Sequence, residues 1–367
     1  MLLPARERGV HEHAHARANG HQGGNAGGAV EDPTGRHGAC RLSVLVTGAT
    51  GFIGASLVNG LRVRGEHVRV LARSPGKAKR LTDQGAVAVL GDITDRRAVA
   101  EAVDGARVVY HLAGRLFEPC VPASEYYATH VEGTKILLDR CEESSVERFV
   151  HCSTTGVLGV TADGPADEAA PYRPTNAYEA TKAQAEQAVR ERARNGFPAV
   201  IARPGLVYGP GDLHLLPFFR AVLRRRFRPI GRDTVWLHPI YIDDVTDALL
   251  RCGERAEALG ECFHLAAGSP VPLAGLADAI ARAGGTRLPG GCIPLPAARA
   301  MAAVGDRLPS KLKRSAPLTR SRLDFLTHSR VYDVTKAQRL LGFAASTDLP
   351  TGAARSLAWY RDEGYLV

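Results

Sequence analysis

Between residues 41 and 203, short apolar runs alternate with segments of helical spacing. The runs rich in β-branched residues predict strands, at SVLVT (43–47), HVRVLA (67–72), AVAVL (86–90), ARVVYHLA (106–113), RFVHCS (148–153) and AVIAR (199–203). The segments between them predict helices over 52–64, 75–81, from 95 onward, 124–141 and 175–194. Because parallel strands need crossover connections, this alternation predicts an α/β fold with a doubly wound parallel sheet covered by helices on both faces.

The pattern changes on both sides of this region. Residues 1–40 are rich in glycine and histidine and nearly lack aliphatic side chains, so burial cannot offset the entropy of ordering them, and they predict a disordered extension. After residue 204 we expect helices near 214–226, 243–252, 271–284, 297–305, 335–341 and 351–363, and short strands near 239–242 and 262–265. Residues 204–367 are therefore predicted to form a smaller domain, mainly for substrate binding and interleaved with 41–203.

A glycine-rich turn follows the first predicted strand and opens the first predicted helix. Its residues are Thr47, Gly48, Ala49, Thr50, Gly51, Phe52, Ile53 and Gly54. Gly48 and Gly51 allow a tight turn and close approach of a ligand, and Gly54 lets the helix pack on the sheet. The free N–H groups at the N-terminus of the helix attract a diphosphate. This context predicts a dinucleotide-binding Rossmann domain over 41–203.

The second predicted strand ends in Arg73 and Ser74, where an NAD site would normally place a carboxylate on the ribose hydroxyls. Arg73, with Ser74 and Lys77, can bind a 2′-phosphate instead, so we expect NADP(H) in preference to NAD(H), which stays the alternative. The alternative is that Arg73 is only a solvated charge at the end of the strand, in which case the sequence does not favour NADP(H) over NAD(H). After the third strand, Asp92 can accept a hydrogen bond from adenine, and Ile93 lies beside it.

Tyr178 and Lys182 are four residues apart on a predicted helix and therefore share a face. An adjacent ammonium favours the phenolate, so we expect Lys182 to lower the pKa of Tyr178 and to fit it for proton exchange with a carbinol oxygen during hydride transfer. Lys182 can also hold the nicotinamide ribose. The same spacing is common on surface helices, so the pair alone does not establish catalysis.

These motifs occur in order with HLAG (111–114), CSTT (152–155) and RPGLVYGPGD (203–212), and together they resemble the extended branch of the short-chain dehydrogenase/reductase superfamily, which includes the NAD-dependent epimerase/dehydratase family. The resemblance covers about residues 42–250, with a looser match at 329–343. It implies that Thr154 binds the substrate oxygen beside Tyr178, with Ser153 the less favoured candidate. It also implies a homodimer through the helices at 124–141 and 175–194, and cofactor contacts from Leu112, Ala113, Gly114, Ser153, Pro204, Gly205 and Val207.

Departures from the family pattern bear on the substrate. Members that act on nucleotide sugars usually have Asn at the position of Leu206 and often Arg at that of His238, and 4,6-dehydratases have an acidic pair at 155–156. Leu206 cannot contact a diphosphate, so the resemblance narrows to branches similar to dihydroflavonol reductases and 3β-hydroxysteroid dehydrogenases. His238 is a candidate for substrate contact, with a packing role as the alternative.

His130 stands where relatives commonly have an Asn that bends the helix and helps to hold a proton-relay water. An imidazole that titrates near neutral pH could shuttle a proton itself. The alternative, which we favour, is a buried, hydrogen-bonded histidine that fills the space.

The formal net charge of +9 comes largely from basic runs at 220–232 and 311–322. Neither has the interleaved aromatic residues of a base-stacking surface, so we expect a solvated face or substrate rim and no nucleic-acid partner. Seven cysteines without a CxxC pair favour a reducing, cytoplasmic location. No apolar stretch is long enough for a transmembrane helix. Charges interrupt the short apolar face of the segment 295–308, so we do not expect it to contact a membrane surface. We also expect no metal site.

We therefore predict an NAD(P)-dependent oxidoreductase that interconverts a secondary alcohol and a ketone on a small, largely apolar molecule of sterol, flavonoid or polyketide type. Tyr178 is the proton donor or acceptor, Thr154 orients the carbonyl, and Lys182 tunes the tyrosine. Two alternatives stay open. One is an epimerase or isomerase, as on sugars, that retains its nicotinamide, and the other is a non-catalytic nicotinamide-sensing regulator.

Overall fold

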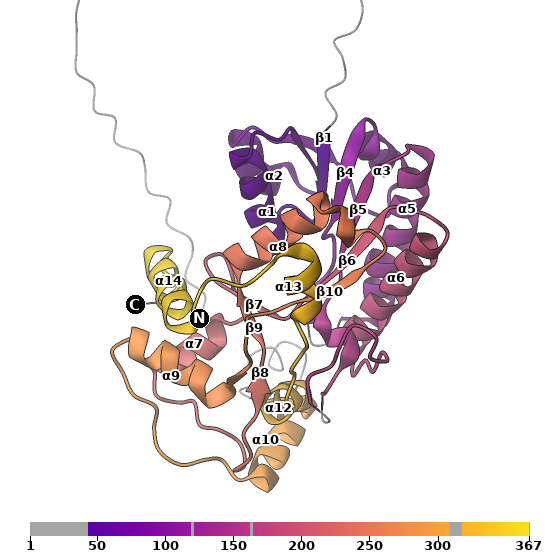
Figure 1. Ribbon diagram of the computed structural model, residues 1–367. Coiled ribbons are helices and arrows are strands. Elements are labelled where there is room, and N and C mark those ends of the chain that lie inside the picture. The colour runs from indigo at the N-terminus through magenta and orange to yellow at the C-terminus, as the bar shows by residue number, and fades with distance from the viewer. Residues whose placement is uncertain (1–42, 119–120, 162–163, 309–317, 367) are drawn as a thin grey trace, which may run out of the picture. The chain divides into compact units, whose positions relative to one another are not determined.

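The computed structural model describes residues 43–118, 121–161, 164–308 and 318–366. A seven-stranded sheet has the order β10-β6-β5-β4-β1-β2-β3, and each neighbouring pair is parallel (Figure 1). The strands are β1 Ser43–Thr47, β2 Val68–Ala72, β3 Val87–Leu90, β4 Ala106–His111, β5 Arg148–Cys152, β6 Ala199–Pro204 and β10 Cys262–Leu265. The predicted parallel sheet is confirmed.

Helices cover both faces of this sheet. One face is covered by α1 Phe52–Val63, α2 Pro75–Asp83, α8 Ile242–Glu254 and α13 Thr335–Leu341, and the other by α3 Arg96–Val103, α5 Gly133–Glu143 and α6 Ala177–Arg194. Side chains alternate along β1, because Val44 and Val46 pack with Leu57 and Leu249 in one core while Leu45 packs with Val99 in the other. Two separate cores on one sheet are what the doubly wound prediction requires.

The helical segment between β4 and β5 differs from the single regular helix predicted over 124–141. Helix α4 (Ala123–Tyr127) leads into a π-helical turn (Ala128–Glu132), which continues into α5. A π turn closes its hydrogen bonds over five residues in place of four, so it shifts the side chains that follow onto a different face. His130 lies in this turn.

The elements after β6 build a second region and also complete the sheet. Besides α8, β10 and α13, they are β7 Leu206–Tyr208, α7 Leu216–Leu223, β8 Trp236–Leu237, β9 Pro239–Tyr241, a short 3₁₀ turn at Ala256–Ala258, β11 Val271–Pro272, α9 Leu273–Ala283, α10 Leu295–Arg307, α12 Arg320–Thr327 and α14 Leu349–Asp362. Another short 3₁₀ turn, Thr155–Leu158, follows β5. Strand β7 pairs with β9 in parallel, and β8 pairs with β11 in antiparallel orientation.

Two outcomes in this region differ from the sequence-based expectation. Strand β10, expected among the pieces of the smaller domain, is an edge strand of the main sheet, because its apolar residues pair with β6. Helix α12 was not predicted. None of the helices in the described part of the chain combines the length and apolar character needed to cross a bilayer. The predicted disordered extension, 1–40, lies outside the described residues.

The packing of α1 on the sheet gives a first testable prediction. Leu57 is fully buried, so we expect Leu57→Ala to lower the free energy of unfolding by about 3 kcal/mol through lost apolar contact and the cavity left behind. Val63, on the same helix, is 81% exposed, and Val63→Ala should change the same quantity by less than about 0.5 kcal/mol. Urea denaturation followed by circular dichroism measures both, and equal effects would contradict the assigned packing.

Candidate active site

The glycine-rich turn joins β1 to α1 and approaches the end of β4. Gly48 has φ +69°, and a Cβ atom there would lie 2.4 Å from the Leu112 carbonyl oxygen. A Cβ atom on Gly54 would lie 2.3 Å from the Gly48 carbonyl oxygen, so α1 packs directly on the turn. Gly51 is the N-cap of α1 and offers no side chain to its first N–H groups. These groups, beside the exposed Thr50, fit the diphosphate of a dinucleotide.

The ends of β2 and β3 bring together two of the predicted cofactor residues. The Arg73 side chain is 74% exposed, and its Nη1 lies 3.7 Å from Asp92 Oδ2. Asp92 Oδ1 accepts hydrogen bonds from the Thr94 amide and hydroxyl at 3.0 and 2.8 Å. Ile93 is buried. An exposed guanidinium at this strand end fits a ribose phosphate, and Ser74 and Lys77 lie next to it at the start of α2.

The predicted catalytic residues come from α6 and from the end of β5. Asn176 caps α6 by accepting a hydrogen bond from the Glu179 amide at 3.0 Å, which places Tyr178 in the first turn. One turn later, Lys182 is buried and its Nζ donates to the Cys152 carbonyl at 2.6 Å. Thr154 follows β5 and its hydroxyl contacts Tyr178. The structure therefore brings Tyr178, Thr154 and Lys182 to the carboxyl edge of the sheet.

The electrostatics of Tyr178 differ from the sequence-based expectation. Burial raises the pKa of Tyr178. The neighbouring Cys152 and Glu179 raise the pKa of Tyr178 further, and the hydrogen bond with Thr154 lowers it. The expectation that Lys182 gives Tyr178 a lowered pKa is wrong for this structure. The Lys182 ammonium is directed to the Cys152 carbonyl, and burial lowers the pKa of Lys182 itself. Tyr178 is thus a protonated phenol at neutral pH, suited to donate a proton.

The Ser153 hydroxyl is part of a buried hydrogen-bond network around an ion pair. Its hydroxyl donates to Glu186 Oε2 at 2.7 Å, and Arg203 Nη2 donates to Glu186 Oε1 at 2.7 Å. Arg203 and Glu186 are 1% and 0% exposed. The Tyr172 hydroxyl also donates to Glu186, at 2.8 Å. Thr154 is therefore the hydroxyl left beside Tyr178. Sequence reasoning missed Glu186 and Arg203, although the spacing Tyr178, Lys182, Glu186 places all three on one helix face.

The other predicted cofactor residues lie at the ends of β4 and β6. The Leu112 amide bonds the Thr47 carbonyl, and the Ala113 amide bonds the Thr47 hydroxyl at 3.2 Å, so the segment through the exposed Gly114 is tied to the glycine turn. After Pro204, a Cβ atom on Gly205 would lie 2.5 Å from the His238 carbonyl oxygen. Leu206 and Val207 follow in β7 and are half-buried.

The two histidine candidates both have internal hydrogen-bond partners. His238 Nε2 lies 2.7 Å from the Ala267 carbonyl, and its Nδ1 accepts from the Tyr332 amide at 3.3 Å. Burial lowers the pKa of His238, so the ring is neutral and both nitrogens are used by the protein. His130 is 1% exposed, and its ring centroid lies 5.5 Å from that of Tyr178. A third buried histidine, His111, bridges the Thr47 and Thr134 hydroxyls and was not predicted.

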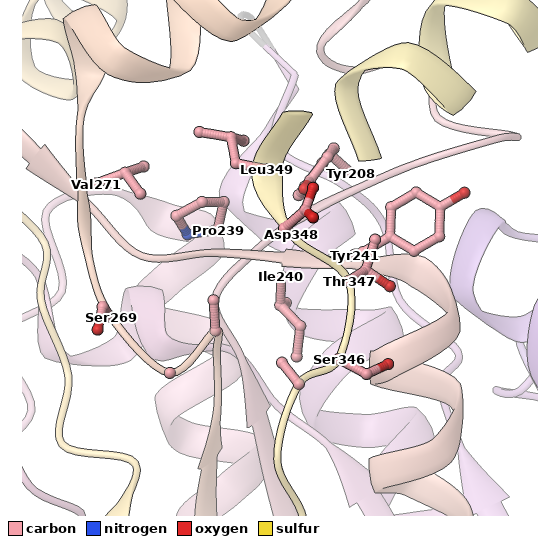
Figure 2. Close-up of a pocket in the computed structure, with 13 residues that line it drawn as sticks. Tyr208, Pro239, Ile240, Tyr241, Ser269, Val271, Ser346, Thr347, Asp348 and Leu349 are labelled. Carbon is pink, nitrogen blue, oxygen red and sulfur yellow. The ribbon is translucent and has the colours of Figure 1, made fainter. Parts of the chain in front are cut away.

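A separate pocket of about 260 Å³ lies beside the β7–β9 pair. Figure 2 shows its lining, which includes Tyr208, Tyr241 and Ser269 with Asp348 and Leu349 at the start of α14. None of the predicted catalytic or cofactor residues lines it. It is therefore distinct from the group around Tyr178.

The sequence and the fold of the chain are similar to those of known proteins. The family profile described as NAD dependent epimerase/dehydratase family matches residues 44–266. The chain is 33% identical over 83% of its length, and 92% of the relative's, to the 4-hydroxy-2-methyl-3-oxo-4-farnesyl-3,4-dihydroquinoline-1-oxide ketoreductase of Stigmatella aurantiaca. It is 31% identical to a 3 beta-hydroxysteroid dehydrogenase/Delta 5-->4-isomerase of Mycobacterium tuberculosis, over 82% of this chain and 85% of that one. A solved structure of MoeE5 in complex with UDP-glucuronic acid and NAD matches with a TM-score of 0.69 and 28% identity, over 88% of this chain and 99% of that one.

The buried ion pair between Glu186 and Arg203 should stabilise the fold, and its contribution should depend on pH. Burial alone would raise the pKa of Glu186, but the bonds and charge of Arg203, aided by Ser153, lower it from 4.5 to about 2. We expect Glu186→Gln to reduce the free energy of unfolding by about 3 kcal/mol, because it leaves the Arg203 charge buried and uncompensated. The contribution of ionised Glu186 is complete above pH 4.5 and is lost as the pH falls toward 2, so the difference from wild type should narrow over that window.

Thermal unfolding between pH 7 and pH 2 measures this difference. Glu191→Gln, which changes an exposed glutamate on the same helix, is the matched control and should leave the unfolding curve nearly unchanged. A Glu186→Gln variant as stable as the control would show that the pair contributes nothing to the fold.

Proposed function

Because this chain belongs to the NAD dependent epimerase/dehydratase family, we propose that it reduces a ketone, or oxidises the matching secondary alcohol, on a small and largely apolar substrate. Membership in the family and relatives named for such reactions make it an NAD(P)-dependent oxidoreductase that acts on CH–OH groups. This proposal depends on one observation: Thr154, Tyr178 and Lys182 are grouped at the carboxyl edge of the parallel sheet, the same edge at which the glycine turn follows β1.

Hydride transfer is the chemistry that a bound nicotinamide would supply to the proposed reaction. Thr154 holds the substrate oxygen by a hydrogen bond, and Tyr178 donates its phenolic proton to that oxygen in the direction of reduction. Tyr178 begins in the required protonation state, because burial raises its pKa. Lys182, held at the Cys152 carbonyl, is the residue we assign to the nicotinamide ribose.

An apolar substrate is supported by the residue after the glycine at the end of β6. Leu206 supplies no hydrogen bond from its side chain, and the His238 ring is used by Ala267 and Tyr332. A nucleotide diphosphate would find neither an amide nor a charge at these two positions. The relatives compared above include proteins named for a farnesylated quinoline oxide and for a steroid, both of which are largely apolar molecules.

Tyr178→Phe tests the proposed acid. Removing the phenolic proton should lower kcat by about 10³ while leaving the Kd for NADPH unchanged, because the hydroxyl acts on the substrate oxygen. Steady-state measurements with a panel of apolar ketones measure kcat, and fluorescence titration measures Kd. Tyr127→Phe, at a 41% exposed position, is the matched control and should keep full activity. Full turnover by Tyr178→Phe would remove this residue from the mechanism.

We further propose that the chain prefers NADP(H), with Arg73 binding the 2′-phosphate. Arg73→Ala should raise the Kd for NADPH about tenfold or more, because it removes charge-assisted hydrogen bonds, and should change the Kd for NADH less than about twofold. Isothermal titration of both cofactors measures this. Lys79→Ala, which removes an exposed charge paired with Asp83 on α2, is the control. Equal losses for both cofactors would contradict the assignment.

A further inference from the structure

Two buried side chains on the helical segment after β4 bind the backbone of the loop that follows the same strand. His130 Nε2 accepts a hydrogen bond from the Arg115 amide at 3.0 Å. The Tyr126 hydroxyl accepts one from the Glu118 amide at 2.8 Å and donates to the Glu118 carbonyl at 3.1 Å. Both side chains are 1% exposed. The loop 115–118 is therefore held at its two ends by groups from one helical segment.

The hydrogen bonds of His130 determine where its ring proton lies. Nδ1 is 2.9 Å from the Thr181 hydroxyl oxygen on α6, and that hydroxyl donates its own proton to the Ala177 carbonyl at 2.9 Å. The Arg115 carbonyl also lies 3.2 Å from Nε2, but the Arg115 amide is directed at that nitrogen at 3.0 Å. Because the Thr181 oxygen is left to accept, we assign the ring proton to Nδ1 and leave the Nε2 lone pair to accept from the Arg115 amide. Both ring nitrogens are used, and each binds a different element of the fold.

The same two rings contact the proposed acid. The ring centroids of His130 and Tyr126 lie 5.5 and 6.2 Å from that of Tyr178, both nearly perpendicular to it, and 5.8 Å from each other. The groups facing His130 are Lys182 and Tyr178 from α6, His111 from β4, His151 from β5, and Tyr126. Burial and the charge of Lys182 lower the pKa of His130 to about 3, so it is neutral at physiological pH.

We infer that His130 and Tyr126 form a clamp that fixes the loop 115–118 relative to the hydroxyl of Tyr178, with His130 a neutral positioning residue and not a proton carrier. This inference rests on the proposed function, because it assigns the loop to the substrate side of the same site. The loop presents Leu116, whose side chain is 63% exposed, which suits contact with an apolar substrate. The clamp thus links substrate placement to the position of the acid.

Amide hydrogen exchange tests the clamp without any turnover. His130→Ala should speed exchange of the Arg115 amide, and Tyr126→Phe should speed exchange of the Glu118 amide, because each loses its buried acceptor. Each variant should leave most of the amides of α6 protected as in wild type. Unchanged exchange at both loop amides would overturn the clamp, and it would do so whether or not the proposed reaction is correct.

Turnover of the complete enzyme tests the positioning role. Thr181→Val has nearly the shape of threonine but removes the acceptor for His130 Nδ1–H, so kcat should fall about tenfold with the Kd for NADPH unchanged. Thr181→Ser should restore the rate. Thr129→Val is the matched control and should keep the wild-type rate, because it removes a hydroxyl that donates to the Glu125 carbonyl on the same helical segment.

The pH dependence of kcat/KM separates positioning from proton transfer. A neutral positioning residue predicts the same apparent pKa values in wild type, Thr181→Val and His130→Ala, with only the height of the profile reduced. If His130 carried the proton, its removal would shift the profile and added imidazole would restore the rate, and either result would overturn the inference. A wild-type rate in Thr181→Val would also overturn it.

Discussion

The charges buried beneath α6 are the constraint on which the rest of the site depends. Arg203 and Glu186 are almost fully removed from water, and such groups are tolerated only when they are paired and their remaining hydrogen-bonding atoms are satisfied. That requirement ties α6 to β6, to the end of β5 through Ser153, and to the preceding loop through Tyr172. The register of α6 on the sheet is fixed as a result, and the residues one and two turns earlier are fixed with it.

Desolvation also sets the protonation states around the proposed acid. The pKa of Tyr178 is raised by burial, and the pKa values of His130 and Lys182 are lowered by it. A phenol that keeps its proton lies beside a histidine that stays neutral, which is why we assign proton donation to the tyrosine. The same dry environment makes each hydrogen bond to the loop 115–118 more costly to break.

The sequence predicted the elements of the main sheet within a few residues, because strands buried on both faces and amphipathic helices leave strong periodic patterns. It also identified the glycine turn and the Tyr178–Lys182 pair, whose chemistry depends on local spacing. It did not predict the π turn at 128–132, where His130 bonds Thr181 on α6 and the following Thr134 bonds His111 on β4, because these contacts join segments far apart in the chain. Nor did it identify Glu186 and Arg203 as partners, which are adjacent only once α6 lies on β6.

The sequence by itself determined the parallel α/β architecture, the family and the residues that we propose for hydride-transfer chemistry, since each of these is encoded in local order and spacing. Only the tertiary structure decided what surrounds those residues. The direction of the Tyr178 pKa shift, the partner of the Lys182 ammonium and the fully used ring of His130 all depend on burial and on contacts between segments far apart in the chain. These quantities are properties of an environment, and an environment exists only after the chain has folded.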